Sequence, residues 1–470
     1  MYESLRSKLH DGTLVVGVMG LGYVGTPLSL AFSRKYRVLG FDIRPDLVQS
    51  LRQGDGRLLG IPREELIQAL DSRFVPTTDL NRLGECDVFV IAVGTPLAED
   101  HDPDLSQIED AAREITRRLR PGHFIVLEST SYPGTTEEVL VPILESGGMR
   151  AGRDFGVAFS PERVDPGNTE YRVEDIPKLV GGLDEASTEF ARAFYAQVIR
   201  EVIPVSHARV AEAAKIIENL FRAVNIALVN EISLILERLN IDTWEAIDAA
   251  STKPFGFMRF YPGPGVGGHC IPLDPYYLSY RARKAGYMPR FIELSGHVNE
   301  YMKFHTLDLL RQGLKEAGKP AAGSSVAILG VSFKRNVADT RESPAARVIE
   351  ECLKDGMKVR AYDPHVSVIA TRKGTIVSEL DAESAVAQAD AAVILVDHEE
   401  FMRLDFEALA RLMEAPPVWV DCRNVLREAP RGTICLGIGR ARGRVPAAKG
   451  TTVEFLAESE RRTRSSKEER

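Results

Sequence analysis

The chain has 470 residues and a formal net charge of −8, which argues against nucleic acid or an anionic membrane as its general partner. Apolar residues make up 44% of it, enough to fill the cores of the two or three domains that this length predicts. The five cysteines are dispersed without zinc-site spacing, and the sequence shows neither a signal peptide nor a membrane span, so we expect a cytoplasmic protein with reduced thiols and no metal.

Residues 1–205 alternate short apolar runs with helical patterns. Such alternation predicts βαβ units and a Rossmann-like, doubly wound parallel sheet. The expected strands are "TLVVGVMG", "RVLGFD", "DVFVIAV", "HFIVLEST", "GVAFS", "PKLVGG" and "EVIPV".

The first expected strand runs into "GLGYVG", a G-x-G-x-x-G pattern at the start of a helix. In this pattern the first glycine allows a tight turn, the second lets the backbone approach a pyrophosphate, and the third lets helix pack on strand. Asp42 closes the next strand, where an acid binds the ribose hydroxyls of NAD. Arg44 could favour NADP instead, but Asp42 would repel a 2′-phosphate, so we expect NAD. The expected cofactor contacts here are Gly20, Gly22, Tyr23, Val24, Gly25, Asp42 and Arg44.

Later strands of this domain also end in polar turns. The carboxyl ends of parallel strands line one crevice, and ligands bind there. A turn needs Gly and Pro in any case, but that need does not explain Thr95, Thr130 and Glu162 at strand ends. The polar residues of these turns are Gly94 and Thr95 in "VGTP", Thr130 in "ESTSYPG", and Glu162, Arg163 and Asp165 in "SPERVDPG".

Residues 206–318 change to a helical pattern. The stretch "SHARVAEAAKIIENLFRAVNIALVNEISLILERL" lacks Gly and Pro and carries apolar residues at helical spacing. It predicts one long helix with Ser206 as its N-cap. Lys215 and Asn219 are four residues apart and therefore share one face, which is either exposed to solvent or part of a polar crevice.

The loop "PGPGVGGHCIPLDPYY" places one thiol, Cys270, after four glycines. Glycine allows the backbone to come close to a ligand. Cys270 precedes a predicted helix with Pro272 near its first turn, and a thiol at a helix N-terminus has a lowered pKa and is a better nucleophile. Asp274 lies one turn further on. We expect the other four cysteines to be inert, buried residues.

Residues 319–445 restart the strand–helix alternation, which predicts a second α/β domain. Its expected strands lie in "SSVAILGVSFK", "KVRAYDPH", "AAVILVDHEE" and "PVWVDCRN". The tail, residues 446–470, is charged and has no apolar periodicity, so we expect it to be disordered.

Taken together, the motifs resemble the UDP-glucose/GDP-mannose dehydrogenase family over nearly the whole chain. The resemblance rests on "GLGYVG", "STSYPGTT", "SPERVDPG", "EAAKIIENLFRAVNIALVNE", "PGPGVGGHCIPLDP" and "GVSFKRNVADTRESPA". It implies an NAD-dependent four-electron oxidation of a UDP-sugar C6 alcohol to the carboxylate, as in surface polysaccharide precursor synthesis. Within the family, "SPERVDPGN" and "FYPGPGVGGHCIPLDPYYL" are similar to the N-acetylhexosamine branch, the UDP-N-acetyl-D-glucosamine 6-dehydrogenases above all.

The resemblance also implies roles for individual residues. Cys270 would form a thiohemiacetal and then a thioester. Lys215 and Asn219 would bind the reacting oxygen, Asp274 and Thr130 would hold a water, and Glu162 would act as acid or base. The implied substrate contacts are Glu162, Arg163, Asp165, Lys215, Asn219, Gly265, Gly267, Gly268, Lys334 and Arg423, with Arg259 reaching a partner subunit's substrate. The further implied cofactor contacts are Gly94, Thr95, Thr130 and Arg341. The long helix would form the core of a homodimer.

Several alternatives stay open at this point. The sugar could be UDP-N-acetylmannosamine, UDP-N-acetylgalactosamine or UDP-glucose. A catalytically inactive NAD-sensing regulator is a different class, which the presence of Cys270, Lys215, Asn219 and Asp274 disfavours. A two-electron 3-hydroxyacid dehydrogenase would need neither Cys270 nor the second α/β domain.

Overall fold

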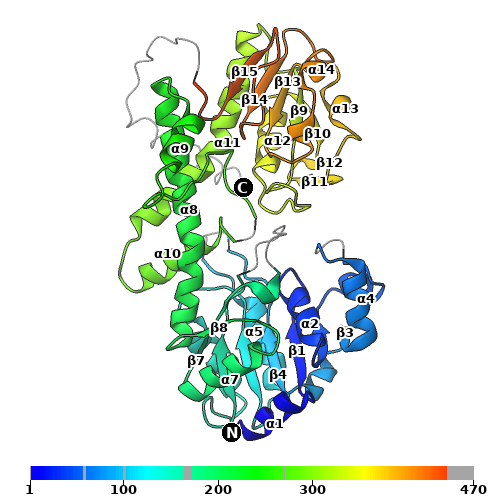
Figure 1. The fold of residues 1–470 in the computed structure, drawn as a ribbon, viewed down its shortest axis with the longest axis vertical. Coiled ribbons are helices and arrows are strands. Elements are labelled where there is room, and N and C mark those ends of the chain that lie inside the picture. Colours follow the sequence, from blue (N-terminus) through cyan, green and yellow to red (C-terminus); the bar gives the residue numbers. More distant parts are fainter. Residues whose placement is uncertain (1, 57–59, 99–101, 164–171, 269, 442–470) are drawn as a thin grey trace. The chain divides into compact units, whose positions relative to one another are not determined.

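The computed structural model describes residues 2–56, 60–98, 102–163, 172–268 and 270–441. The chain divides into two compact units (Figure 1). The first comprises Met1–Asn219 and Tyr276–Met288, and the second comprises Leu220–Pro275 and the chain from Pro289 onward. Asp165 and the tail predicted to be disordered lie outside the described residues.

The first unit contains an eight-stranded sheet in the order β3-β2-β1-β4-β5-β6-β7-β8. Neighbouring strands are parallel except β6 and β7, where Ala158 pairs antiparallel with Gly182. This pair departs from the predicted parallel sheet because the described part of the β6–β7 connection has only one short 3-10 turn, whereas a parallel connection needs a crossover helix. The strands are β1 (Val15–Met19), β2 (Arg37–Phe41), β3 (Phe74–Thr77), β4 (Val88–Ile91), β5 (Phe124–Leu127), β6 (Gly156–Phe159), β7 (Lys178–Gly182) and β8 (Val202–Pro204).

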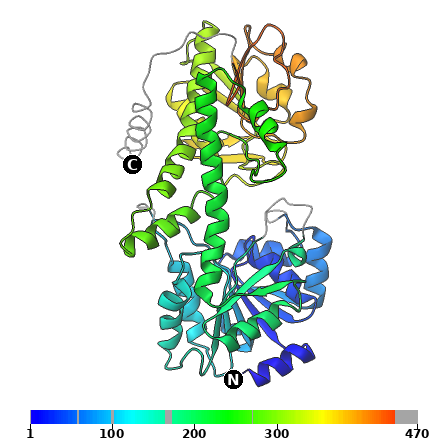
Figure 2. The ribbon, with the colours of Figure 1, turned by 60° about the vertical axis from the view of Figure 1, so that its left-hand side comes forward.

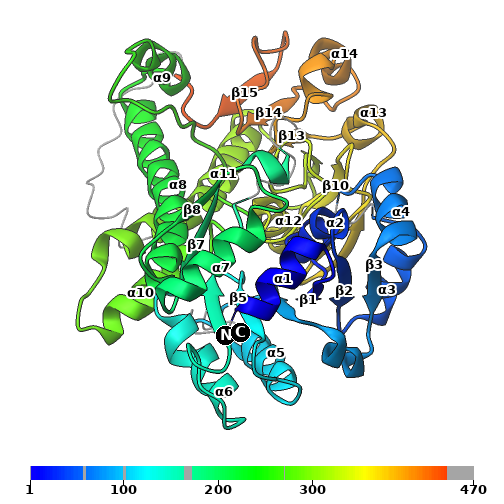
Figure 3. The same ribbon diagram turned by 60° about the horizontal axis from the view of Figure 1, so that its bottom comes forward.

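Helices cover both faces of this sheet, because its central strands are apolar on both sides (Figure 3). Val88 and Val90 of β4 point to one core, and Phe89 and Ile91 point to the other. The helices of the first core are α1 (Glu3–Asp11), α2 (Gly25–Ser33), α3 (Pro45–Arg52), α4 (Arg63–Ser72) and α7 (Glu185–Tyr195). Those of the second are α5 (Ser106–Thr116), α6 (Val141–Glu145) and the first turns of α8.

A single helix of 31 residues, α8 (Ala208–Arg238), follows the first sheet, as the sequence predicts (Figure 2). His207, not Ser206, precedes its first residue and accepts a hydrogen bond from the backbone of Ala211. Among the described residues, α8 is the one helix whose length and mean hydropathy of 1.3 would suit a membrane span. One such helix is weak evidence of a span, because the core helix of a soluble protein passes the same test. The helices after it are α9 (Thr243–Ser251), α10 (Asp274–Lys284) and α11 (Arg290–Glu316).

The second unit contains a five-stranded parallel sheet in the order β10-β9-β13-β14-β15. Its strands are β9 (Ser325–Leu329), β10 (Lys358–Tyr362), β13 (Ala391–Ile394), β14 (Val418–Asp421) and β15 (Ile434–Gly437), and β11 (Val368–Thr371) and β12 (Gly374–Val377) form a separate hairpin. One core holds α11 and α12 (Pro344–Lys354), and the other holds α13 (Ala382–Val386) and α14 (Phe406–Ala410). The molecule is thus an α/β protein with two Rossmann-like sheets and a long central helix.

Candidate functional site

The glycine-rich turn after β1 has the geometry that a dinucleotide pyrophosphate requires. Gly20 has a φ of +93°, and a Cβ there would lie 2.5 Å from the carbonyl oxygen of Ala92. A Cβ at Gly25, the first residue of α2, would overlap the carbonyl oxygen of Gly20. At Gly22, in contrast, a Cβ would meet no heavy atom within 4 Å. The fold itself requires the outer two glycines, whereas Gly22 leaves open space in which the backbone can approach a phosphate.

Asp42 follows β2 directly and is fixed beside this turn. Its carboxylate accepts hydrogen bonds from the backbone N–H groups of Leu21 and Arg44, both at 2.9 Å. The exposed Arg44 side chain forms an ion pair with it at 3.3 Å. The acid is therefore well placed for the ribose hydroxyls of NAD, and it holds the arginine that would otherwise attract a 2′-phosphate. Tyr23 and Val24 are partly exposed on the turn.

The turns after β4 and β5 are joined to each other. Ser129 Oγ donates a hydrogen bond to the carbonyl of Val93 at 2.8 Å. Thr95 is buried, Gly94 is exposed and Thr130 is partly exposed. Both turns follow the carboxyl ends of parallel strands, the edge at which open α/β sheets bind ligands.

Glu162 and Arg163 follow β6 and are both partly exposed. The Arg163 guanidinium forms an ion pair with Glu218 of α8 at 2.7 Å and donates to the carbonyl of Pro177 at 2.6 Å. Arg163 thus holds its turn against α8, a structural task that the sequence did not indicate.

Lys215 and Asn219 are each only 8% exposed, so they do not lie on a solvent-exposed face of α8. Three residues before Lys215, the buried Glu212 accepts hydrogen bonds from the backbone N–H groups of Gly134 at 2.5 Å and Thr136 at 2.9 Å. Burial raises the pKa of Glu212. These bonds fix the start of α8 to the turn after β5. Glu212 was not among the residues predicted from the sequence, because an acid one turn before a lysine is typical of a helix surface.

A second group of buried polar side chains lies under the turns after β5 and β6. It too was not predicted from the sequence. Glu128 and Lys178 form an ion pair at 2.9 Å, with side chains 0% and 7% exposed. Tyr195 donates a hydrogen bond to the other carboxylate oxygen. Burial raises the pKa of Glu128, the charge of Lys178 opposes this rise, and the charge of Glu162 adds to it. The one signal in the sequence is that Glu128 is charged although it directly follows a buried strand.

The glycine loop before Cys270 packs closely on other parts of the second unit. A Cβ at Gly267 would lie 2.8 Å from the carbonyl oxygen of Glu342 and 2.8 Å from Cβ of Phe333. Gly268 has a φ of +83°, and a Cβ there would lie 2.8 Å from the Phe333 ring. Its N–H also donates to the carbonyl of Arg341 at 2.9 Å. These glycines therefore have a packing role in addition to the ligand approach that the sequence predicts for them.

The loop is also held by buried amides. Gly263 donates its N–H to Asn230 Oδ1 at 3.0 Å, and Asn230 Nδ2 donates to Asn299 Oδ1 at 3.0 Å. A Cβ at Gly265 would lie 3.1 Å from the carbonyl oxygen of Asn299. Because buried amides are costly unless paired, this network fixes the path of the loop toward Cys270.

Cys270 is exposed, and its carbonyl accepts hydrogen bonds from the N–H groups of Leu273 and Asp274. The second of these bonds, at 2.9 Å, is the helical bond of the first residue of α10, so Cys270 sits at the entry to that helix. Asp274 is buried. The helix that the sequence predicts after Cys270 therefore begins at Asp274.

The other four cysteines differ from Cys270 in exposure and acidity. Cys86, Cys352 and Cys422 are buried and Cys435 is partly buried. Burial raises the pKa of all four thiols, to about 12 for Cys86 and Cys352. Such thiols are poor nucleophiles at neutral pH, and Cys270 is the exposed one.

Arg423 follows β14 and contacts the glycine loop. It donates to Asp397 Oδ1 at 3.0 Å and to the carbonyl of Pro262 at 3.4 Å. Lys334 is partly exposed in the loop after β9. Both residues, predicted to bind the UDP-sugar, thus lie in loops at the carboxyl ends of parallel strands, the usual ligand edge.

The two remaining predicted arginines are exposed and ion-paired. Arg341 binds Asp339 at 2.7 Å. Arg259 lies 3.8 Å from Asp248, and its guanidinium is 5.4 Å from the centre of the Tyr261 ring. A ligand phosphate would have to share or replace these partners.

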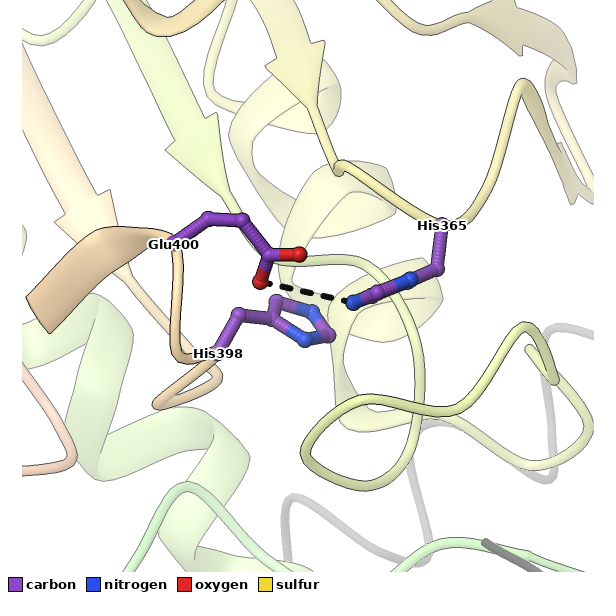
Figure 4. Close-up of side chains that lie close together, drawn as sticks. All are labelled: His365, His398 and Glu400. Atoms are coloured by element: carbon purple, nitrogen blue, oxygen red, sulfur yellow. Dashed lines mark ion pairs between the residues drawn. The ribbon is translucent and has the colours of Figure 1, made fainter. Parts of the chain in front are cut away.

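One group of side chains in the second unit has the composition of a metal site (Figure 4). His365, His398 and Glu400 place one ligand atom each within 4.8 Å of one another, and His365 lies 3.5 Å from Glu400. His398 Nδ1 accepts a hydrogen bond from the backbone of Asn336 at 3.0 Å, so Nε2 carries the proton and donates to Asp363. His398 therefore has no lone pair to offer a metal, and two ligands are too few for a stable site.

Models of the UDP-glucose/GDP-mannose dehydrogenase family match three parts of the chain. The NAD binding domain matches residues 14–199, the central domain 209–301, and the UDP binding domain 327–428. The chain belongs to this family. It is accordingly an NAD-dependent oxidoreductase of the nucleotide-sugar dehydrogenase class.

Several relatives are dehydrogenases of N-acetylated nucleotide sugars. A UDP-N-acetyl-D-glucosamine 6-dehydrogenase of Pseudomonas aeruginosa is 37% identical over 88% of this chain and 98% of its own. An NDP-N-acetyl-D-galactosaminuronic acid dehydrogenase of Ralstonia nicotianae is 35% identical over 84% and 93%. The solved structure of a UDP-D-ManNAc dehydrogenase from Pyrococcus horikoshii is 34% identical, with a TM-score of 0.84 over 91% of this chain and 100% of that one.

Proposed function

We propose that the protein oxidises the C6 alcohol of a UDP-N-acetylhexosamine, UDP-N-acetylglucosamine foremost, to the uronate, which serves in surface polysaccharide synthesis. The observation that carries this proposal is Cys270, an exposed thiol at the entry to α10, among four buried or partly buried thiols of raised pKa. The names of these relatives support an N-acetylated sugar, and "SPERVDPGN" supports the same branch.

The reaction removes four electrons as two hydrides, which two NAD⁺ molecules accept in turn, and consumes one water. Gly22 would hold the pyrophosphate of the cofactor, because no protein atom fills the space beside its backbone. Asp42 would hold the adenosine ribose, because its carboxylate is hydrogen-bonded to the backbone of the same turn. Gly94, Thr95, Thr130 and Arg341 would complete that site.

Cys270 holds the intermediate between the two oxidations. Its thiolate adds to the carbonyl carbon of the C6 aldehyde, the S–C bond forms, and the oxygen takes up a proton to give a thiohemiacetal. The second oxidation turns this adduct into a thioester. Water then breaks the S–C bond, which releases the carboxylate and returns the thiol.

Other polar residues have complementary tasks in this proposal. Lys215 and Asn219, both buried on α8, bind the reacting oxygen, and the lysine stabilises its negative charge. Asp274 and Thr130 hold the water for hydrolysis. Glu162 is the acid or base that moves its proton.

Several loops would contact the sugar nucleotide. Lys334 and Arg423 would meet the UDP group, Gly265, Gly267 and Gly268 the sugar, and Glu162, Arg163 and Asp165 its other side. In this division, residues 1–205 bind NAD, residues 206–318 carry the thiol and the dimer contact, and residues 319–445 bind UDP.

The homodimer proposal rests on α8. Val210, Ile217, Phe221, Leu228 and Ile235 are exposed, and their spacing of seven, four, seven and seven residues puts them on one stripe. A second copy would cover this stripe and bring Arg259 to the partner's substrate. Ile217→Glu should give monomers in analytical ultracentrifugation, and a monomeric wild type would contradict the proposal. The reduced thiols favour the cytoplasm.

The activity is tested with a panel of UDP-sugars and GDP-mannose, with NAD⁺, followed by NADH absorbance. We expect the UDP-N-acetylhexosamines to react much faster than UDP-glucose and to yield two NADH per uronate. Faster oxidation of the manno or galacto epimer would reassign the sugar only. UDP-glucose or GDP-mannose as best substrate would refute the branch, and no reaction with any sugar would favour the NAD-sensing alternative.

A further inference from the structure

The buried cluster of Glu128, Lys178 and Tyr195 has no part in the chemistry proposed above. Replacing a buried ion pair by apolar side chains is often neutral or stabilising, because removing two charges from water is costly. Stability alone therefore gives little reason for this cluster.

The hydrogen bonds of this cluster connect it to the turns that carry Thr130 and Glu162. Besides Glu128, Lys178 Nζ donates to the carbonyl of Pro161 at 3.3 Å, and Pro161 directly precedes Glu162. Ser160 Oγ donates to the carbonyl of Leu179 at 2.9 Å, which ties the same turn to β7 a second time.

Glu128 forms the other side of the connection, since it lies two residues before Thr130. One ammonium group thus binds the turn of Thr130 through the Glu128 carboxylate and the turn of Glu162 through the Pro161 carbonyl. Burial raises the pKa of Glu128, and the charge of Glu162 adds to that rise.

The geometry points to Lys178 and Glu128 as positioning residues for Glu162. Lys178 sets the backbone from which the Glu162 side chain projects, and Glu128, held by Tyr195, keeps the lysine in place. This inference rests on the proposed function, in which Glu162 moves the proton for hydrolysis of the Cys270 thioester. A displaced Glu162 should slow that step and leave the thioester on Cys270.

The test compares Lys178→Met with the double variant Glu128→Gln/Lys178→Met, after the wild type has been shown to oxidise a UDP-sugar. The single variant leaves Glu128 buried without its cation and should melt at lower temperature. The double variant removes both charges, and the amide introduced at position 128 can still accept a hydrogen bond from the Tyr195 hydroxyl. Its melting temperature should therefore return close to that of the wild type.

The readouts are kcat, the KM for NAD⁺, and the mass of the intact protein during turnover. We expect the double variant to lose at least about tenfold in kcat, with a smaller change in the KM for NAD⁺, because misplaced acid–base groups are costly. The sugar adduct should be present in its mass spectrum and absent from that of the wild type. Wild-type kcat in a stable double variant, or reduced kcat without adduct, would overturn the inference.

Two further variants complete the design. Lys319→Met is the matched control, since Lys319 is also largely buried, pairs with Asp390 at 3.2 Å and donates to the carbonyl of Glu414 at 2.7 Å. It should lose stability and keep kcat. If the double variant does not fold, Tyr195→Phe carries the test, with about threefold lower kcat expected and a lower melting temperature, because a buried oxygen of Glu128 loses its donor. An unchanged kcat there would overturn the inference, whereas an inactive wild type would remove the proposed function itself.

Discussion

Gly22→Ala should separate cofactor binding from folding. A methyl group at this position meets no protein atom within 4 Å, so it introduces no clash. Replacing glycine where its backbone suits alanine is neutral to slightly stabilising, by about 0.4–1 kcal/mol, through the unfolded chain. The same methyl would occupy the space that a pyrophosphate needs against the backbone. We expect the KM for NAD⁺ to rise at least about tenfold, a loss of about 1.4 kcal/mol in binding.

The comparison variant is Gly25→Ala, whose methyl would overlap the carbonyl oxygen of Gly20. Overpacking of this kind costs about 1–3 kcal/mol or more of folding free energy. Urea unfolding and calorimetric titration with NADH measure the two effects independently. If Gly22→Ala binds NADH as the wild type does, the turn does not hold the pyrophosphate. If Gly25→Ala is as stable as the wild type, the close packing of α2 on the turn does not limit this position.

Cys270 should be the first thiol labelled by iodoacetamide in the native protein, because the other four are buried or partly buried with raised pKa values; peptide mapping showing another cysteine labelled first would contradict this. Cys270→Ser should lose most turnover and Cys270→Ala should form no covalent adduct, and uronate production by the alanine variant near the wild-type rate would exclude the thioester route. The kcat/KM of the wild type should be at least about tenfold higher with NAD⁺ than with NADP⁺. Asp42→Ala should reduce this ratio, because it removes the ion-pair partner of Arg44. Equal kcat/KM values in the wild type would mean that Arg44 determines the cofactor preference. Gly267→Ala should lower the unfolding free energy by about 1–3 kcal/mol, because its methyl would press on Phe333, and a wild-type urea midpoint would refute that packing.

Local sequence patterns were sufficient for most of the fold. Every strand expected from an apolar run is present, and the absence of Gly and Pro correctly indicated α8. Four of the described strands, β3, β11, β12 and β15, were not predicted, and each has only four residues. β3 is only four residues long and contains Pro76, and the antiparallel β7 depends on a connection whose shape its letters do not reveal.

The candidate site was predictable where chemistry follows from spacing, as in the glycine turn with Asp42. It was not predictable where partners are distant along the chain. Lys178 is 50 residues from Glu128, and Gly268 is 65 residues from the Phe333 ring that fills the space beside it. A glycine required by a ligand and a glycine required by a neighbouring side chain look the same in a sequence.

The contact between the glycine loop and Phe333 has a consequence for protein engineering. Phe333 directly precedes Lys334 in the loop after β9. Grafting this loop from a relative, in order to change the nucleotide preference, would therefore also replace the ring against which Gly267 and Gly268 pack. A graft with a different side chain at position 333 would leave a void or a collision two residues from Cys270. The two loops should therefore be transplanted as one module, and libraries that diversify either should vary positions 267, 268 and 333 jointly.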